Sequence, residues 1–255
     1  MKLGSMDCVL AAQVPDAFKR AARLGLQGVE VNLSIKPLLA GDRSQIETAR
    51  RASVETGVQV VSAVLGEHNH GGLATWWRGS EAEEELQHAI RATAAMGASD
   101  LLVPFFFFNE PKGRVHRAAV ARRIRPLCEL AADQGVRFCF EGVLTADQLL
   151  ELIGLVDHDR FGVYYDPANA TWCDYDIAAE ARRLGRHLLR THLKEAATFT
   201  GDARLGQGRV NHAAYAAALK DIGYTGWFVL ETPAGDDAEV TADIAFARRA
   251  YGAVA

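Results

Sequence analysis

Short apolar runs, rich in β-branched and aromatic residues, recur along the whole chain. Runs of this kind predict buried β-strands. Between them, apolar residues are spaced three or four positions apart, as on one face of an α-helix. The expected strands cover residues 2–6, 28–33, 58–65, 100–108, 136–142, 161–166, 188–194 and 227–232. The expected helices cover residues 17–24, 43–56, 81–96, 115–133, 147–156, 177–184, 212–222 and 238–251.

The alternation of strands and helices predicts a parallel sheet, because each strand must return through a helical crossover. Most of the helical stretches end near a glycine, such as Gly57 and Gly97, which suits a left-handed helix end. Eight such units in 255 residues match the size of a closed (β/α)8 TIM barrel. The alternative is an open doubly wound sheet, but "MDCVLA" follows the first strand in place of a G-x-G-x-x-G turn. No linker divides the chain, so we expect one domain over residues 1–255.

Four polar residues stand at the ends of the last four predicted strands. They are Glu141, Asp166, His192 and Glu231. The carboxyl ends of barrel strands open on one face, where TIM-barrel active sites lie, so these side chains are expected to meet there. Each also has a structural alternative: Asp166, which precedes Pro167, is the type of residue that forms a turn or a helix cap, and His192 is compatible with a buried core histidine.

Three carboxylates that converge with one imidazole would repel one another unless a cation lies between them. Oxygen and nitrogen ligands without thiolate suit Mn²⁺, Mg²⁺, Co²⁺ or Zn²⁺ and argue against a closed structural zinc site. The sequence therefore predicts one divalent metal ion held by Glu141, Asp166, His192 and Glu231, with Mn²⁺ as the first choice.

Composition and charge exclude several classes of protein. The formal net charge is −4 and the basic residues are interspersed with acidic ones, so we expect no nucleic-acid partner. No apolar run has the roughly 18 residues of a membrane span, and the first residues do not form a signal peptide. The four cysteines are scattered and show no C-x-x-C spacing, which indicates a reducing, cytoplasmic location.

Several segments resemble the sugar phosphate isomerase/epimerase branch of the xylose isomerase-like TIM-barrel superfamily. They are "YYDPANA", "THLKE", the Glu of "FCFEG" and the stretch from "LGQGRVNH" to "WFVLET", and the similarity runs nearly end to end. The resemblance implies that Glu141, Asp166, His192 and Glu231 bind one divalent metal and that Glu141 and Glu231 double as acid and base. Two departures are Gly142 and Val143 after the strand-five glutamate, where many relatives have Asn, and Asn169, where several have His.

The implied chemistry is removal of a proton next to a carbonyl through an enediolate, followed by its return to give an epimer or an isomer. The substrate is expected to be a small sugar, sugar phosphate or keto-polyol. A dehydratase or lyase that loses a leaving group from the same enediolate is the alternative. An apurinic-site endonuclease is disfavoured, because the extra His and Asp ligands of a multi-zinc centre are missing. A non-catalytic sugar-binding barrel would not need two bases, and a homo-oligomer is left open.

Further residues near the predicted mouth are candidates for substrate contacts. Asn169 offers a hydrogen bond to a hydroxyl, and Lys194 lies two residues after His192, on the same side of its strand. The other candidates follow strands three, six and seven: Glu67, His68, Trp172 and Arg209.

Overall fold

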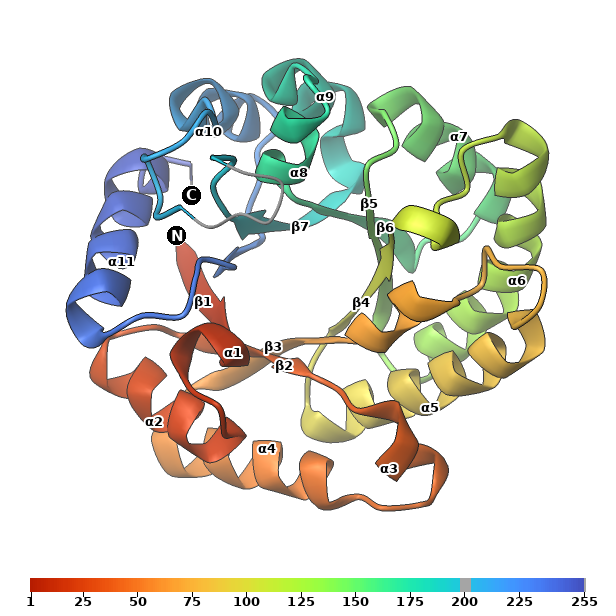
Figure 1. Cartoon of the computed structure of the whole chain (residues 1–255), viewed down its shortest axis with the longest axis horizontal. Helices are drawn as coiled ribbons and strands as arrows, with labels where there is room; N and C mark the ends of the chain where they lie inside the picture. The colour runs from red at the N-terminus through yellow and green to blue at the C-terminus, as the bar shows by residue number, and fades with distance from the viewer. Residues whose placement is uncertain (198–202, 255) are drawn as a thin grey trace.

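The eight strands of the computed structural model close into a parallel barrel surrounded by helices (Figure 1). Each strand pairs with the next one in sequence, and the last pairs with the first. The predicted (β/α)8 barrel is thereby confirmed. The structure describes residues 1–197 and 203–254. The strands are Lys2–Met6 (β1), Gly28–Asn32 (β2), Gln59–Val64 (β3), Asp100–Phe105 (β4), Arg137–Gly142 (β5), Phe161–Tyr165 (β6), Leu188–Leu193 (β7) and Trp227–Leu230 (β8).

The long helices lie where the apolar spacing predicts them, within a few residues at each end. They are Val14–Arg23 (α2), Ser44–Thr56 (α4), Gly79–Met96 (α5), Arg114–Asp133 (α6), Ala146–Val156 (α7), Ile177–Leu184 (α9), His212–Asp221 (α10) and Asp237–Tyr251 (α11). Gly57 and Gly97 adopt the expected left-handed conformation, with φ of 71° and 85°. In the part of the chain that the structure describes, no helix is long and apolar enough to cross a membrane.

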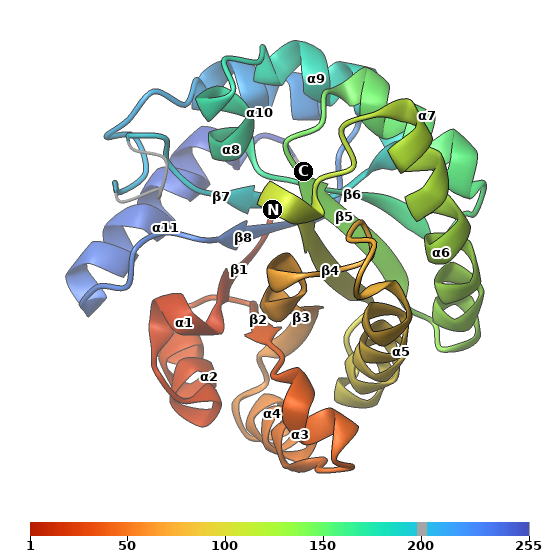
Figure 2. The same ribbon diagram turned by 45° about the vertical axis from the view of Figure 1, so that its right-hand side comes forward.

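Short helices, which the sequence pattern did not predict, follow most of the strands. They are Asp7–Leu10 (α1), Ile35–Leu39 (α3), Pro167–Trp172 (α8) and the 3₁₀ turns Gly66–His70 (η1), Phe107–Asn109 (η2) and Gly185–His187 (η3). Too few residues are present in any of them for a helical period to emerge. Figure 2 shows α8 between the barrel strands and the outer helices α9 and α10. Apart from η3, these short elements build the face where the strands end.

The fourth strand is shorter than predicted because the chain turns after Phe105. Phe107 adopts a φ of 55°, and Asn109 fixes the turn with a fully buried side chain. Asn109 Nδ2 donates hydrogen bonds to the backbone oxygens of His68 and Pro104, and its Oδ1 accepts one from the Ala74 backbone N–H. Asn109 thereby joins the connection after β3 to the connection after β4.

A small apolar core fills the interior of the barrel. It consists of Val61, Val64, Leu102, Cys139, Tyr164, Trp227 and Val229. Gly28 leaves room for it, since a Cβ there would lie 2.1 Å from Val61 Cγ2 and 3.0 Å from the Trp227 ring. The barrel is therefore closed below its mouth, and the functional site is confined to the carboxyl ends of the strands.

Candidate metal and active site

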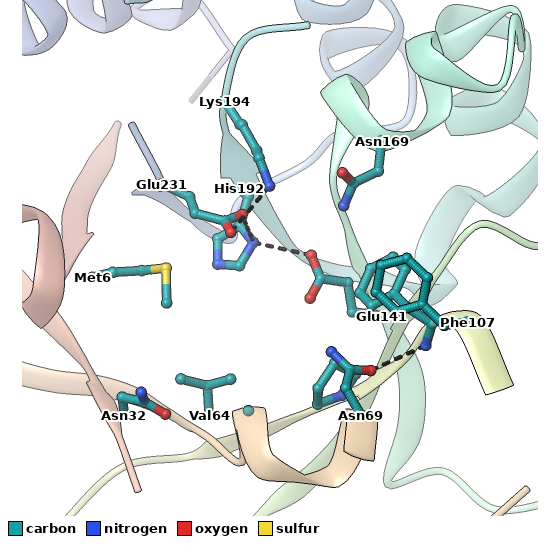
Figure 3. A pocket seen from close by; sticks show the side chains of 13 residues that line it. Met6, Asn32, Val64, Asn69, Phe107, Glu141, Asn169, His192, Lys194 and Glu231 are labelled. Carbon is teal, nitrogen blue, oxygen red and sulfur yellow. Dashed lines mark hydrogen bonds and ion pairs between the residues drawn. The ribbon is translucent and has the colours of Figure 1, made fainter. Parts of the chain in front are cut away.

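The structure brings the four predicted ligands together at the barrel mouth. Glu141 lies in β5, Asp166 directly follows β6, His192 lies in β7 and Glu231 directly follows β8. One ligand atom from each residue lies within 4.8 Å of the others. Figure 3 shows the side chains of Glu141, His192 and Glu231 turned toward the same space. The cluster is a direct consequence of parallel strands that end at similar heights.

His192 is at the centre of the cluster and is 1% exposed. Its Nδ1 lies 3.2 Å from Glu141 Oε1 and 3.0 Å from Glu231 Oε2. One ring nitrogen can carry only one proton, so it cannot donate a full hydrogen bond to both carboxylates. Glu231 Oε2 accordingly has no hydrogen-bond partner among the described residues, although it is buried.

Asp166 caps a helix and also belongs to the cluster. As the N-cap of α8, its Oδ1 accepts hydrogen bonds from the backbone N–H groups of Ala168, at 2.7 Å, and Asn169, at 3.3 Å. Pro167 occupies the first helical position, where the missing N–H costs nothing. The second oxygen, Oδ2, is buried and makes no hydrogen bond within the described chain. A helix cap therefore uses one oxygen and leaves the other for the cluster.

Lys194 is the cation nearest to the cluster. Its Nζ lies 3.2 Å from Glu231 Oε1 and 3.6 Å from Asp166 Oδ2. Figure 3 places Lys194 and Asn169 beside the carboxylates, at the edge of the same space. One lysine and one histidine face the carboxylates of Glu141, Asp166 and Glu231, so negative charge is in excess.

The three carboxyl groups of the cluster differ in pKa, which is raised for Glu141 and Asp166 and lowered for Glu231. Burial, reinforced by Glu231 and Asp166, raises the pKa of Glu141 to about 7, and burial also raises the pKa of Asp166. Burial alone would raise the pKa of Glu231, but His192 and Lys194 hold it at about 2. Burial alone would lower the pKa of His192, but the surrounding glutamates raise it well above its ordinary value. Without a metal, the cluster thus retains protons to balance its charge.

A divalent ion fits these residues on two grounds. Asp166 Oδ2 and Glu231 Oε2 are buried oxygens without hydrogen-bond partners, which is unusual in folded proteins and costly. The donor set of three carboxylates and one imidazole also suits a borderline or hard divalent cation. The cluster could therefore hold a metal ion through Glu141, Asp166, His192 and Glu231.

Glu30 in β2 is a fourth acid in contact with the site, and the sequence analysis missed it. It is fully buried; its Oε1 lies 3.0 Å from His192 Nε2 and its Oε2 accepts a hydrogen bond from Ser62 Oγ at 2.5 Å. The contact orients the imidazole so that Nδ1 faces the cluster. The available signal was a glutamate in the middle of the apolar run 28–33, since burying a carboxylate requires a partner.

A cavity of about 360 Å³ opens beside the cluster. Glu141, His192 and Glu231 lie in its wall together with Lys194 and Asn169. The remaining wall comes from the ends of the other strands and the connections that follow them: Met6, Asn32, Val64, Gly66, Asn69, Pro104, Phe106 and Phe107. This volume is at the small end of the range for ligand pockets, which suits a small molecule.

Four of the predicted substrate-contact residues do not line this cavity. Glu67 is exposed. His68 is folded into the loop after β3, where its Nε2 accepts a hydrogen bond from the Leu73 backbone and burial lowers its pKa to about 3. Trp172 ends α8 with the Arg209 guanidinium 5.7 Å from its ring centre, outside the cavity wall. The loop residues that do reach the cavity include Asn69 and Phe107, which no periodic pattern marks.

A closed parallel barrel with an imidazole and three carboxylates at its mouth is a (β/α)8 barrel with a candidate metal site. The profile of the xylose isomerase-like TIM barrel family matches residues 18–250, and the chain belongs to that family. No curated protein sequence matches the chain.

Solved structures with the same fold include several sugar epimerases. A D-psicose 3-epimerase crystallised with D-fructose has a TM-score of 0.83 at 18% identity, over 99% of this chain and all of that one. The 3-keto-D-glucoside 4-epimerase of E. coli has a TM-score of 0.81 at 20% identity, over 98% of this chain and 99% of that one. A probable 3-DHS dehydratase of Bacillus anthracis has a TM-score of 0.77 at 16% identity, over 96% and 98% of the two chains. At these identities the similarity concerns the fold.

Proposed function

We propose that this protein is a divalent-metal-dependent epimerase or isomerase of a small keto-sugar. The observation that carries the proposal is the cluster of one imidazole and three carboxylates at the barrel mouth, of which Glu141, His192 and Glu231 line a small cavity. Several solved structures with this fold are sugar epimerases, which agrees with this substrate class. Mn²⁺, Mg²⁺, Co²⁺ and Zn²⁺ are the candidate ions.

The chemistry requires removal of a proton from a carbon next to a carbonyl. A divalent ion held by Glu141, Asp166, His192 and Glu231 would polarise the carbonyl and offset the negative charge that develops on the substrate. Glu141 and Glu231 both contact His192 Nδ1 and come from the ends of two different strands, which supports a role for them on different sides of a substrate in the cavity. One removes the proton and the other supplies one to the opposite face.

The remaining cavity residues bind and orient the sugar. Lys194 keeps Glu231 ionised through a 3.2 Å contact and presents an ammonium group to substrate oxygens. Asn169 supplies an amide at the start of α8, where it can bond a hydroxyl. Phe106 and Phe107 give the cavity an apolar wall suited to the C–H face of a sugar.

The test is deuterium uptake by a panel of ketoses, keto-polyols and their phosphates in D₂O with Mn²⁺. Solvent deuterium next to the carbonyl is expected in at least one compound, and the product identifies epimerisation, isomerisation or loss of water. Absence of both exchange and product from the metal-loaded protein over the whole panel would contradict the proposal. Loss of water as the main outcome would assign the protein to the dehydratase class.

Replacement of each base by its amide tests the assignment within the site. Glu141→Gln and Glu231→Gln are expected to lower turnover by about 10²-fold or more, because a positioned base is lost. Glu67→Gln is the matched control, since this exposed glutamate lies outside the cavity and its loss should leave turnover unchanged. Parental turnover in both amide variants, with metal bound, would refute the two-base assignment.

A further inference from the structure

A second cavity, of about 460 Å³, lies at the end of the barrel opposite the functional site. Its walls come from the amino ends of β1, β5 and β7, from η3 and from the connection between α10 and β8. Four cationic residues, Lys2, Arg137, Arg186 and Arg190, line it, and none of its twelve lining residues is Asp or Glu. We refer to it as the basic cavity.

The inner wall of the basic cavity carries an unbalanced buried charge. Arg190 is 7% exposed and Arg137 is half-buried, and both bind the fully buried carboxylate of Asp100. Two guanidinium groups therefore share one carboxylate. Arg190 Nε is buried and has no hydrogen-bond partner in the part of the chain that the structure describes. A buried charged group with an unused hydrogen-bond donor lowers the stability of the fold unless a ligand accepts a hydrogen bond from it.

The outer wall adds two further positive charges. Lys2 and Arg186 are exposed, and among the described residues the Lys2 ammonium makes one hydrogen bond, of 3.5 Å, to the Thr225 carbonyl. The cavity is positively charged, whereas the chain as a whole has a formal net charge of −4. The positive charge is therefore a local feature and does not reflect a generally basic surface.

We propose that the basic cavity binds a small oxyanion of the phosphate type, either inorganic phosphate or the phosphate group of a metabolite. The planar, multiply donating arginine side chain matches phosphate oxygens better than any other cation of proteins. Arg137 and Arg190 are held in place by Asp100, so their orientation is fixed before the ligand arrives. Lys2 and Arg186 attract the anion at the rim. This site is independent of the function proposed for the barrel mouth.

The two sites lie on the same strand but on opposite sides of the barrel core. Arg190 and His192 are two residues apart in β7, which corresponds to about 7 Å along the strand. Tyr164 and Cys139 belong to the apolar core that fills the barrel between its two ends. A bound anion would therefore not reach the barrel mouth, and its binding can be measured without substrate or metal.

The test is calorimetric titration of the metal-free protein with inorganic phosphate and, separately, with fructose 6-phosphate, at constant ionic strength. Saturable binding is expected for at least one of them, with no response to chloride. Tighter binding of the ester would identify a phosphorylated metabolite as the ligand, and equal or weaker binding would identify phosphate itself. Absence of saturable binding by both would overturn the proposal.

Variants locate the bound anion. Lys2→Gln combined with Arg186→Gln is expected to weaken binding by about tenfold or more, and both positions are exposed, so the fold should persist. Arg190→Lys keeps the charge but removes Nε and is expected to weaken binding as well. Arg122→Gln makes the same charge change as Arg186→Gln at an exposed position of α6 and should have no effect. Equal affinity in all of these variants, or loss of binding only in Lys194→Gln, would overturn the assignment.

Discussion

The contact between Glu30 and His192 leads to a quantitative prediction for Glu30→Gln. The amide has the size of the carboxylate and can still accept from His192 Nε2 while its NH₂ group faces Ser62 Oγ, so the protein should fold. What is lost is the negative charge 3.0 Å from Nε2. A hydrogen bond to a charged group contributes about 1 kcal/mol more than a neutral one, which corresponds to about fivefold in affinity.

The direction of the effect depends on what occupies His192 Nδ1. The Glu30 carboxylate stabilises a proton on His192 and would also stabilise a metal ion bound there, so its removal would weaken the binding of both. The divalent charge interacts more strongly with a nearby carboxylate than a single proton charge does, because the energy scales with the product of the charges. Metal binding should therefore fall, by about 10- to 100-fold, as is usual when a carboxylate behind a ligating histidine is removed.

The measurement is calorimetric titration of the chelator-treated protein with Mn²⁺, with circular dichroism to confirm folding. Ser62→Ala is the matched control: it removes the other partner of Glu30 but leaves the carboxylate against His192. Its effect on metal affinity should be several-fold smaller than that of Glu30→Gln. Parental Mn²⁺ affinity in folded Glu30→Gln would show that Glu30 does not support the histidine.

Two further predictions concern single side chains with separable roles. Asp166→Asn should keep the α8 cap, because the amide oxygen still accepts from Ala168, but lower Mn²⁺ affinity by about 100-fold; calorimetry and thermal melting separate the two effects, and unchanged affinity would remove Asp166 from the ligands. Glu195, for which burial alone would raise the pKa, is held at about 2 by His212 and by backbone N–H groups. A lowered carboxyl pKa stabilises the fold above the unfolded value of 4.5 and loses that contribution as the pH falls toward 2, so the parent should lose up to about 3 kcal/mol more than Glu195→Gln over this interval in denaturant titrations. Equal losses would show that this pair does not contribute.

The strand and helix periods were sufficient to predict the barrel, and strand ends were sufficient to bring Glu141, Asp166, His192 and Glu231 together. Both depend on repeated, local features of the sequence. Glu30 escaped notice because it stands within an apolar strand, away from the strand ends, and its partners Ser62 and His192 lie 32 and 162 residues further along the chain.

The loops at the mouth could not be placed by the same reasoning. His68 was expected near the substrate but is buried under its own loop, where it accepts a backbone hydrogen bond. Phe107 reaches the cavity because Asn109 turns the chain after β4 through bonds to Pro104, at the end of that strand, and to the connection after β3. Such contacts between distant loops carry no period in the sequence, so the cavity wall is less predictable than the cluster itself.

The double use of Asp166 restricts how this position can change during evolution. Glutamate would supply a carboxylate, but its extra methylene displaces the oxygen that closes α8. Serine and threonine are good helix caps but bring no negative charge to the cluster. Aspartate alone meets both demands, so drift at this position is opposed by selection for stability as well as by selection for activity. A lineage that lost the reaction would still be selected to keep a capping residue at this position. Glu141 and Glu231 would no longer be under selection for activity and would be free to change.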